Sequence, residues 1–253
     1  MQGLVEVTDL HVRYGDFEAV KGVSFSLGKG EILGIVGESG SGKSTIARTL
    51  IGLQKASSGT IAIAPANPNA QTPKHQVISL QMIFQDAVGS LNPRMTVEQT
   101  LREVIAHQPA NPNPQTPKPP NTQVPKSLLS LVGLSPAVLD QYPRELSGGQ
   151  CQRVSIARAL ATNPEVLIAD EPVSALDVSV QARVLNLLRD LRRNLGLSIL
   201  LIAHDLAVVK NVCDRVCVME KGLFVECGES AAVLSNPRSA YVKRLLAAVP
   251  SIG

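Results

Sequence analysis

Apolar residues are distributed along this chain in two patterns, and each pattern predicts a different kind of strand. Near the N-terminus apolar and polar residues alternate, which is typical of antiparallel strands buried on one face. These alternating runs lie at residues 4–10, 12–14 and 20–27. Later runs are almost entirely apolar, as expected of strands buried on both faces of a parallel sheet. They lie at residues 31–36, 77–84, 166–169 and 198–203.

Helical spacing of apolar residues separates the buried strands, so the chain is predicted to have an α/β fold. The expected helices start at residue 44, with Ala47, Leu50, Ile51 and Leu53 on the apolar face, and continue at 97–107, 127–132, 136–139, 148–161, 174–195 and 241–248. A hairpin is expected at 215–219 and 223–226. Residues 57–60 are predicted to be a turn, 61–63 a strand and 64–76 a loop. Residues 108–125 are rich in proline and predict an exposed excursion that is neither helix nor strand.

The most specific motif follows the first buried strand and opens the first helix. It fits the pattern G-x-x-x-x-G-K-[ST], whose glycines let backbone N–H groups turn toward one phosphate group while the lysine adds a positive charge. The hydroxyl group after the lysine can bind Mg²⁺, and the helix dipole favours the same anion. The candidate nucleotide-binding residues are Gly37, Ser39, Gly40, Ser41, Gly42, Lys43, Ser44 and Thr45.

Polar residues end the other buried strands, at the edge of the sheet where α/β proteins bind ligands. Gln85 is predicted either to reach Mg²⁺ or the attacking water, or simply to cap its strand. Asp170 and Glu171 are adjacent, so their side chains point in opposite directions and are expected to serve the metal and the reacting water respectively. His204 ends the strand expected beside them, which would place it near the γ-phosphate.

Two further positions are candidates for nucleotide contact. The segment Ser147, Gly148, Gly149 and Gln150 precedes a helix and is a second helix start suited to an anion. Tyr14 stands in a turn, where its ring could lie against a purine or could equally be a packing residue.

Composition narrows the class of protein. The net charge of +3 among 24 basic and 21 acidic residues gives no basis for a nucleic-acid groove. No run of about 20 apolar residues is present to span a membrane. The four cysteines, at 151, 213, 217 and 227, form no C-x-x-C pair, and are expected to be reduced thiols in neither a zinc site nor a disulfide framework.

Taken together, these motifs resemble the nucleotide-binding subunits of ABC transporters, and the likeness covers nearly the whole chain. The resemblance implies a P-loop NTPase core with a mostly parallel sheet, an N-terminal antiparallel β layer and an inserted α-helical subdomain. Residues 37–45 are then the Walker A motif, 166–170 with Glu171 the Walker B motif, 146–150 the signature and 174–177 the D-loop.

The same resemblance implies roles for single residues. Tyr14 stacks on adenine, and Ser147 to Gln150 complete the site of an opposite subunit. Catalysis is assigned to Lys43, Gln85, Glu171 and His204. The cofactors implied are ATP and Mg²⁺, with Ser44, Gln85 and Asp170 as metal ligands.

Residues 90–97 and 236–250 narrow the resemblance to the dipeptide, oligopeptide and nickel importer ATPases. Cys151, Val173 and the pair Ser239-Ala240 depart from that pattern, which leaves the transported substrate open. The implied partners are a second ATPase subunit, identical or paralogous, two membrane permease subunits and, indirectly, an extracytoplasmic solute-binding protein; no nucleic acid is implied. The chain is expected at the cytoplasmic face of the membrane as a peripheral subunit.

The resemblance also implies one ABC ATPase domain over 1–253. Residues 1–85 and 161–230 form its catalytic core, 86–160 the helical subdomain with the proline-rich loop 108–125, and 231–253 a helical tail. Two alternatives stay open. One is a soluble ABC-type ATPase that serves an enzyme complex such as carbon–phosphorus lyase. The other, an ABC-type ATPase acting on DNA or ribosomes, is disfavoured because no coiled-coil insertion, second cassette or basic tract is present.

Overall fold

The computed structural model describes residues 3–63, 79–107, 124–174 and 176–247. Two sheets form the fold. The smaller sheet has the order β2-β1-β4, and consists of β1 (Val5–Tyr14), β2 (Phe17–Leu27) and β4 (Ser58–Ile63). The larger sheet has the order β5-β6-β7-β3-β8-β9, with strands β3 (Ile32–Val36), β5 (Leu80–Ile83), β6 (Val166–Asp170), β7 (Ser198–Ala203), β8 (Arg215–Glu220) and β9 (Leu223–Glu229).

The larger sheet is parallel except at one edge, where β8 and β9 pair as an antiparallel hairpin. Every residue of β3, β6 and β7 is buried, as their continuous apolar runs predict. Successive residues of these strands face two different apolar cores. Ile35 of β3 packs with the N-terminal sheet and the first helix, whereas its neighbour Val36 packs with the later helices.

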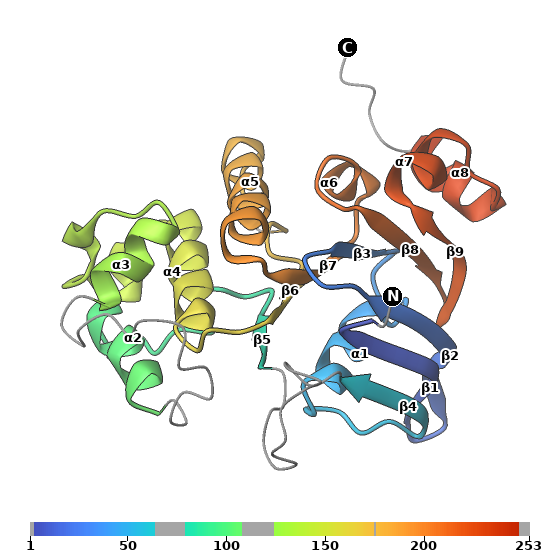
Figure 1. Ribbon diagram of the computed structural model, residues 1–253, viewed down its shortest axis with the longest axis horizontal. Coiled ribbons are helices and arrows are strands. Elements are labelled where there is room, and N and C mark those ends of the chain that lie inside the picture. The colour runs from blue at the N-terminus through green and yellow to red at the C-terminus, as the bar shows by residue number, and fades with distance from the viewer. Residues whose placement is uncertain (1–2, 64–78, 108–123, 175, 248–253) are drawn as a thin grey trace.

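The α-helices follow one another along the chain as α1 (Lys43–Leu50), α2 (Val97–Ala106), α3 (Val124–Leu131), α4 (Gly148–Leu160), α5 (Val178–Leu195), α6 (Leu206–Lys210), α7 (Ser230–Ser235) and α8 (Ala240–Ala247). Figure 1 shows α2, α3 and α4 gathered at one end of the long axis, with the N-terminal sheet and α1 toward the other end. Among the described helices, none is long and apolar enough to cross a membrane.

Several elements differ from the sequence-based expectations. Helix α1 ends at Leu50, which leaves Leu53 64% exposed instead of on an apolar helix face. Strand β4 begins at Ser58, where a turn was expected, because its backbone pairs with β1. Pro125 lies inside α3 and not in a loop, since proline is tolerated in the first turn of a helix. Helix α5 begins at Val178 with Asp177 before it, later than the predicted residue 174.

Two short helices, α6 and α7, were not predicted, and the expected loop at 64–76 and most of the proline-rich segment lie outside the described residues. All four cysteines were expected to be reduced thiols, and this prediction is wrong for two of them. Cys217 and Cys227 occupy directly opposed positions of the β8–β9 hairpin and are joined by a disulfide. Cys151 and Cys213 are buried free thiols, and burial raises the pKa of both.

Candidate functional site

The carboxyl ends of four parallel strands converge on one edge of the sheet. The strand order places β6 beside β5 and β7, and β7 beside β3. Gly37 therefore follows β3, Gln85 follows β5, Glu171 follows β6 and His204 follows β7 at the same edge. Ligands bind at this edge of α/β sheets because loops open there and helix N-termini point toward it.

The phosphate loop, residues 37–45, is closed around its own lysine. Lys43 is only 3% exposed, and its ammonium group donates hydrogen bonds to the carbonyl oxygens of Gly37 at 2.7 Å and Glu38 at 2.8 Å. Helix α1 starts at Lys43, after Gly42, whose φ of 109° is accessible to glycine but strained for other residues. The positive charge of Lys43 and the N-terminus of α1 therefore lie together, where a polyanion can bind.

Neighbouring backbone fixes the shape of this loop. A Cβ atom at Gly37 would lie 2.1 Å from the carbonyl oxygen of Met219, and one at Gly42 would lie 2.4 Å from that of Ala19. The N–H of Gly222, in the turn of the β8–β9 hairpin, donates a hydrogen bond of 2.9 Å to the carbonyl of Ser41. The close approach of backbone requires glycine at positions 37 and 42, and at Gly42 the left-handed φ requires it as well.

A buried carboxylate faces the first turn of α1. Asp170 is 3% exposed at the end of β6, and its Oδ1 accepts a hydrogen bond of 2.9 Å from the hydroxyl of Ser44. Burial raises the pKa of Asp170, although the Ser44 hydrogen bond opposes the rise, and burial lowers the pKa of the Lys43 ammonium. Carboxylate and hydroxyl oxygens are hard ligands, and Mg²⁺ commonly takes one or two protein ligands together with phosphate oxygens and water. The Ser44 and Asp170 pair therefore fits a nucleotide-bound Mg²⁺.

The second acidic residue belongs to a separate polar group. Oε2 of Glu171 accepts a hydrogen bond of 3.0 Å from Nε2 of Gln85 and lies 3.6 Å from Nδ1 of His204. Glu171 has a φ of 45°, a left-handed conformation that is uncommon for residues other than glycine, and its N–H donates to the carbonyl of Ile202. The structure thus gathers Gln85, Glu171 and His204 and directs Asp170 to Ser44, as strand alternation predicts.

The segment Ser147 to Gln150 lies elsewhere on the chain. The Ser147 hydroxyl accepts a hydrogen bond from the N–H of Gln150, and the Gln150 side chain accepts one from the N–H of Ser147, forming a capping box at the start of α4. Gly149 packs so closely against Val180 of α5 that a Cβ atom would come within 2.5 Å of its Cγ1. Figure 1 shows α4 and α1 well apart along the long axis of the molecule.

Tyr14 ends β1 at the tip of the N-terminal hairpin and is 44% exposed. Its partner across the hairpin is Phe17, which is 64% exposed. The next strand, β2, passes the phosphate loop at Ala19. The tyrosine ring is therefore carried by a strand pair that touches the loop, and it presents a free face to solvent.

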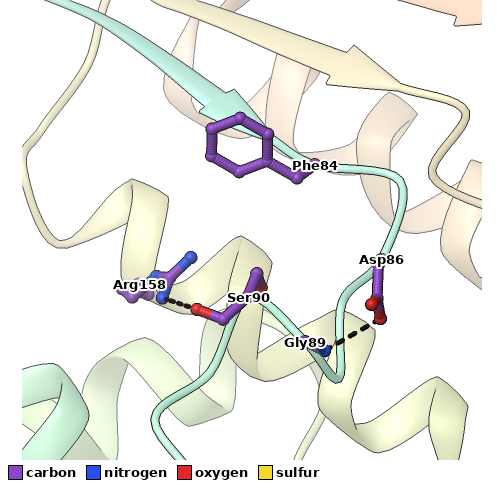
Figure 2. Close-up of a pocket in the computed structure, with 5 residues that line it drawn as sticks. All are labelled: Phe84, Asp86, Gly89, Ser90 and Arg158. Carbon is purple, nitrogen blue, oxygen red and sulfur yellow. Dashed lines mark hydrogen bonds between the residues drawn. The ribbon is translucent and has the colours of Figure 1, made fainter.

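A pocket of about 320 Å³ lies between the segment that follows β5 and helix α4. Phe84, Asp86, Gly89, Ser90 and Arg158 line it, as Figure 2 shows. The Arg158 guanidinium donates a hydrogen bond of 2.6 Å to the Ser90 carbonyl, and burial lowers its pKa. The pocket combines an exposed aromatic ring with a positive charge held on α4.

One contact to the phosphate loop comes from the C-terminal helix α8, far along the chain. Tyr241 of α8 accepts a hydrogen bond from the backbone N–H of Glu38, from a position 203 residues away. No motif signals this contact, because a backbone donor carries no residue-type information and the two positions meet only through the fold.

A phosphate loop after a central strand, with acidic residues at the end of a neighbouring strand, defines the class of P-loop nucleotide-binding proteins. Comparison with known proteins specifies the family. The family model described as "ABC transporter" matches residues 20–174, and the chain belongs to that family.

Individual relatives agree with this assignment. The chain is 46% identical to the oligopeptide transport ATP-binding protein OppF of Salmonella typhimurium over 98% of the chain and 78% of that protein. It is also 46% identical to OppF of Streptococcus pyogenes serotype M1, over 98% of the chain and 82% of that protein.

Solved structures show the same fold. The structure of cbiO1 from Clostridium perfringens, part of the ABC transporter complex cbiONQ, matches with a TM-score of 0.77 and 28% identity over 96% of this chain and 94% of that one. The dimeric ATP-binding cassette MJ0796, in a post-hydrolysis state with ADP and Pi, matches with a TM-score of 0.72 and 26% identity over 89% of this chain and 98% of that one. The expected ABC ATPase fold is thereby confirmed.

Proposed function

We propose that this chain is the ATP-hydrolysing subunit that powers an importer of oligopeptides. Membership of the ABC transporter family and the names of the OppF relatives support this assignment. The observation that carries it is the convergence at one sheet edge of a phosphate loop with the Gln85, Glu171 and His204 group. The same relatives favour an importer over the soluble enzyme complex.

In the proposed reaction, Lys43 and the loop residues Gly37 to Thr45 hold the β- and γ-phosphates of ATP. Lys43 exchanges its two carbonyl partners for phosphate oxygens. Ser44 and Asp170, with Gln85, would hold Mg²⁺, which supplies positive charge against the phosphates when bound. Tyr14 offers its ring to the adenine base.

Glu171 is the proposed general base, because its carboxylate lies at the end of β6 and accepts from Gln85. It takes a proton from the attacking water, and Gln85 orients its carboxylate. His204, 3.6 Å from the same oxygen, is placed to hold the γ-phosphate as the water attacks. Most of the rate acceleration in this scheme comes from positioning and charge stabilisation.

The proposed active unit is a dimer of ATPase subunits, identical or paralogous. Within one chain the capping box of Ser147 to Gln150 is well separated from α1, while its helix start is suited to an anion. A partner's phosphate loop can meet this surface. The dimeric state of the MJ0796 cassette, which shares the fold, supports the arrangement.

Two permease subunits are proposed to contact the pocket beside Gln85, where Phe84 and Arg158 offer an apolar ring and a charge. In this scheme residues 1–85 and 161–230 act as the catalytic core, 86–160 as the helical subdomain that moves with the permeases, and 231–253 as the tail. The chain would then sit at the cytoplasmic face of the membrane, and a solute-binding protein outside would deliver the peptide to the permeases.

A thermal-shift experiment tests the nucleotide site. MgATP at 100 times its Kd should stabilise the wild-type protein by about 2.7 kcal/mol, and Lys43→Ala should abolish this shift. Lys126→Ala, which changes an exposed residue of α3, is the matched control and should keep it. A normal shift in Lys43→Ala would contradict the assignment.

Co-purification tests the partners. A tagged chain expressed with its neighbouring genes should bring down membrane permease subunits from a detergent extract. Recovery of soluble lyase subunits instead would support the enzyme-complex alternative.

A further inference from the structure

The C-terminal helix α8 reaches the phosphate loop through a single hydroxyl group. Tyr241 Oη accepts a hydrogen bond of 3.3 Å from the N–H of Glu38, the second residue of the loop. The carbonyl of the same residue accepts from the Lys43 ammonium and from the N–H of Ser41. Glu38 is thus held on its outer side by α8 and on its inner side by the loop itself.

The tyrosine is rigidly mounted. Its side chain is 5% exposed and packs in the core beneath the larger sheet, together with Val242. The start of α8 is anchored by Glu226 of β9, whose carboxylate accepts hydrogen bonds from the N–H groups of Arg238 and Ser239. The Ser239 hydroxyl in turn accepts from the N–H of Tyr241. A rotation of the ring away from the loop would break this packing.

Arg244 connects Tyr241 with the β8–β9 hairpin, which makes a second contact to the phosphate loop. Its guanidinium lies 5.7 Å from the centre of the Tyr241 ring and 3.7 Å from a carboxylate oxygen of Glu220. Glu220 ends β8, immediately before the turn in which Gly222 donates to the carbonyl of Ser41. Helix α8 and the β8–β9 hairpin therefore brace the loop at Glu38 and Ser41 as one connected unit.

We propose that Tyr241 is a positioning residue for the phosphate loop, which prepares the loop to receive the phosphates of ATP. The proposal rests on the nucleotide site proposed above. A loop that is already ordered loses less conformational freedom on binding, so preorganisation strengthens affinity without a new contact to the ligand. Tyr241 acts through Glu38 and touches no reacting atom, so its effect belongs to binding rather than to the chemical step.

The variant Tyr241→Phe removes the hydroxyl and keeps the ring in the core. It leaves the Glu38 N–H without its partner, and the net worth of one hydrogen bond corresponds to a change of roughly 3- to 10-fold in an equilibrium constant. We expect MgATP and MgADP to bind about 3- to 10-fold more weakly, since both carry the phosphates that the loop holds. The kcat at saturating MgATP should stay within about two-fold of wild type, because the base and its partners are unchanged.

Tyr142→Phe is the matched control. Tyr142 also lies against an arginine, with the Arg144 guanidinium 5.4 Å from its ring centre, but it belongs to the segment before α4. Its substitution should leave nucleotide affinity unchanged.

Amide hydrogen exchange measured by NMR on the nucleotide-free protein tests the contact directly. The Glu38 amide should exchange about 10-fold faster in Tyr241→Phe than in wild type. The Ile32 amide, which donates to Asp214 away from the loop, should not change. A role in general stability would accelerate both amides.

Three results would overturn the proposal. Unchanged exchange of the Glu38 amide would show that the hydroxyl does not hold it. Faster exchange with unchanged MgATP and MgADP affinity would show that the contact does not position the loop. Failure of the wild-type protein to bind MgATP would refute the nucleotide site itself, and this failure is recognised separately because the exchange comparison needs no nucleotide.

Discussion

Gln85 Nε2 donates a hydrogen bond of 3.0 Å to Glu171 Oε2, and this bond joins the ends of the neighbouring strands β5 and β6. Gln85 also lies between Phe84 and Asp86, two residues that line the pocket beside α4. A displacement of that segment would reach the carboxylate proposed as general base through one side chain. The Gln85 to Glu171 hydrogen bond therefore connects the pocket beside α4 with the proposed general base through a single side chain.

Glu171→Gln should bind MgATP but hydrolyse it about 10²- to 10⁴-fold more slowly, the usual contribution of a general base. The amide keeps the shape of the side chain and loses only its capacity to accept the proton. A stable ATP-bound dimer should then accumulate on size exclusion. Glu165→Gln changes a carboxylate immediately before β6, at the opposite end of that strand from Glu171, and should hydrolyse ATP normally. Near-normal turnover of Glu171→Gln would remove Glu171 from its role.

Ser147→Arg should lower ATP hydrolysis about 100-fold or more while a fluorescent ATP analogue still binds. The substitution removes the cap of α4 and places a large charged side chain at a helix start that we assign to the partner's nucleotide. Ser130→Arg, on the exposed side of α3, carries the same change at a control position. If Ser147→Arg abolished binding of the analogue, the segment would belong to the site of its own chain.

Gly37→Ala should destabilise the protein more than Gly40→Ala. A methyl group at Gly37 would lie 2.1 Å from the Met219 carbonyl, so backbone must move, at a cost of about 1–3 kcal/mol or more. Gly40 has open space around it and a φ of +78°, so alanine there suffers only the left-handed strain of about 1–2 kcal/mol. Thermal unfolding of the two variants measures the difference. Equal stability would mean that the loop is not confined by β8.

The stability of the fold is expected to depend on pH because His11 of β1 pairs with Glu18. A hydrogen bond to Glu18, with help from Asp9, raises the pKa of His11, while His11 and Arg13 lower the pKa of Glu18. The raised histidine pKa contributes stability that is complete below about pH 6.5 and is lost as the pH rises through the raised value. The lowered Glu18 pKa contributes stability above about pH 4.5 that is lost as the pH falls.

The pair should therefore stabilise the fold most between about pH 4.5 and 6.5. Glu18→Gln should lower Tm more at pH 6.0 than at pH 8.5, because arginine stays charged at both values and only His11 titrates between them. Asp140→Asn changes an exposed carboxylate between α3 and α4, serves as the control and should shift Tm equally at both pH values. A Tm loss in Glu18→Gln that did not depend on pH would assign the stability to Arg13 alone.

Periodicity was sufficient to predict the strands and the long helices because their apolar residues are buried in the expected register. The apolar runs predicted at 166–169 and 198–203 lie in fully buried strands, and the helix predicted at 97–107 corresponds to α2. The adjacency of β6 and β7, expected from a single crossover helix, is confirmed by their pairing. Strand adjacency then brings Glu171 and His204 together.

Local sequence patterns did not predict several other features of the structure. Ser58 is part of a strand because β1 offers hydrogen-bonding partners, and Pro125 is helical because it falls in a first turn. The spacing of Cys217 and Cys227 along the sequence does not indicate a disulfide. The register of the β8–β9 hairpin places the two residues opposite each other, but the sequence alone does not give that register. The Tyr241 contact to Glu38 had no sequence signal at all.

The Lys43 ammonium already donates hydrogen bonds to the carbonyl oxygens of Gly37 and Glu38, so an anion that binds the lysine must compete with these two acceptors. An incoming anion must offer the lysine more than two neutral acceptors already provide, and charge-assisted bonds to several phosphate oxygens do so. A singly charged anion gains far less from the exchange. This competition would favour a polyphosphate chain over a singly charged anion at the proposed nucleotide site.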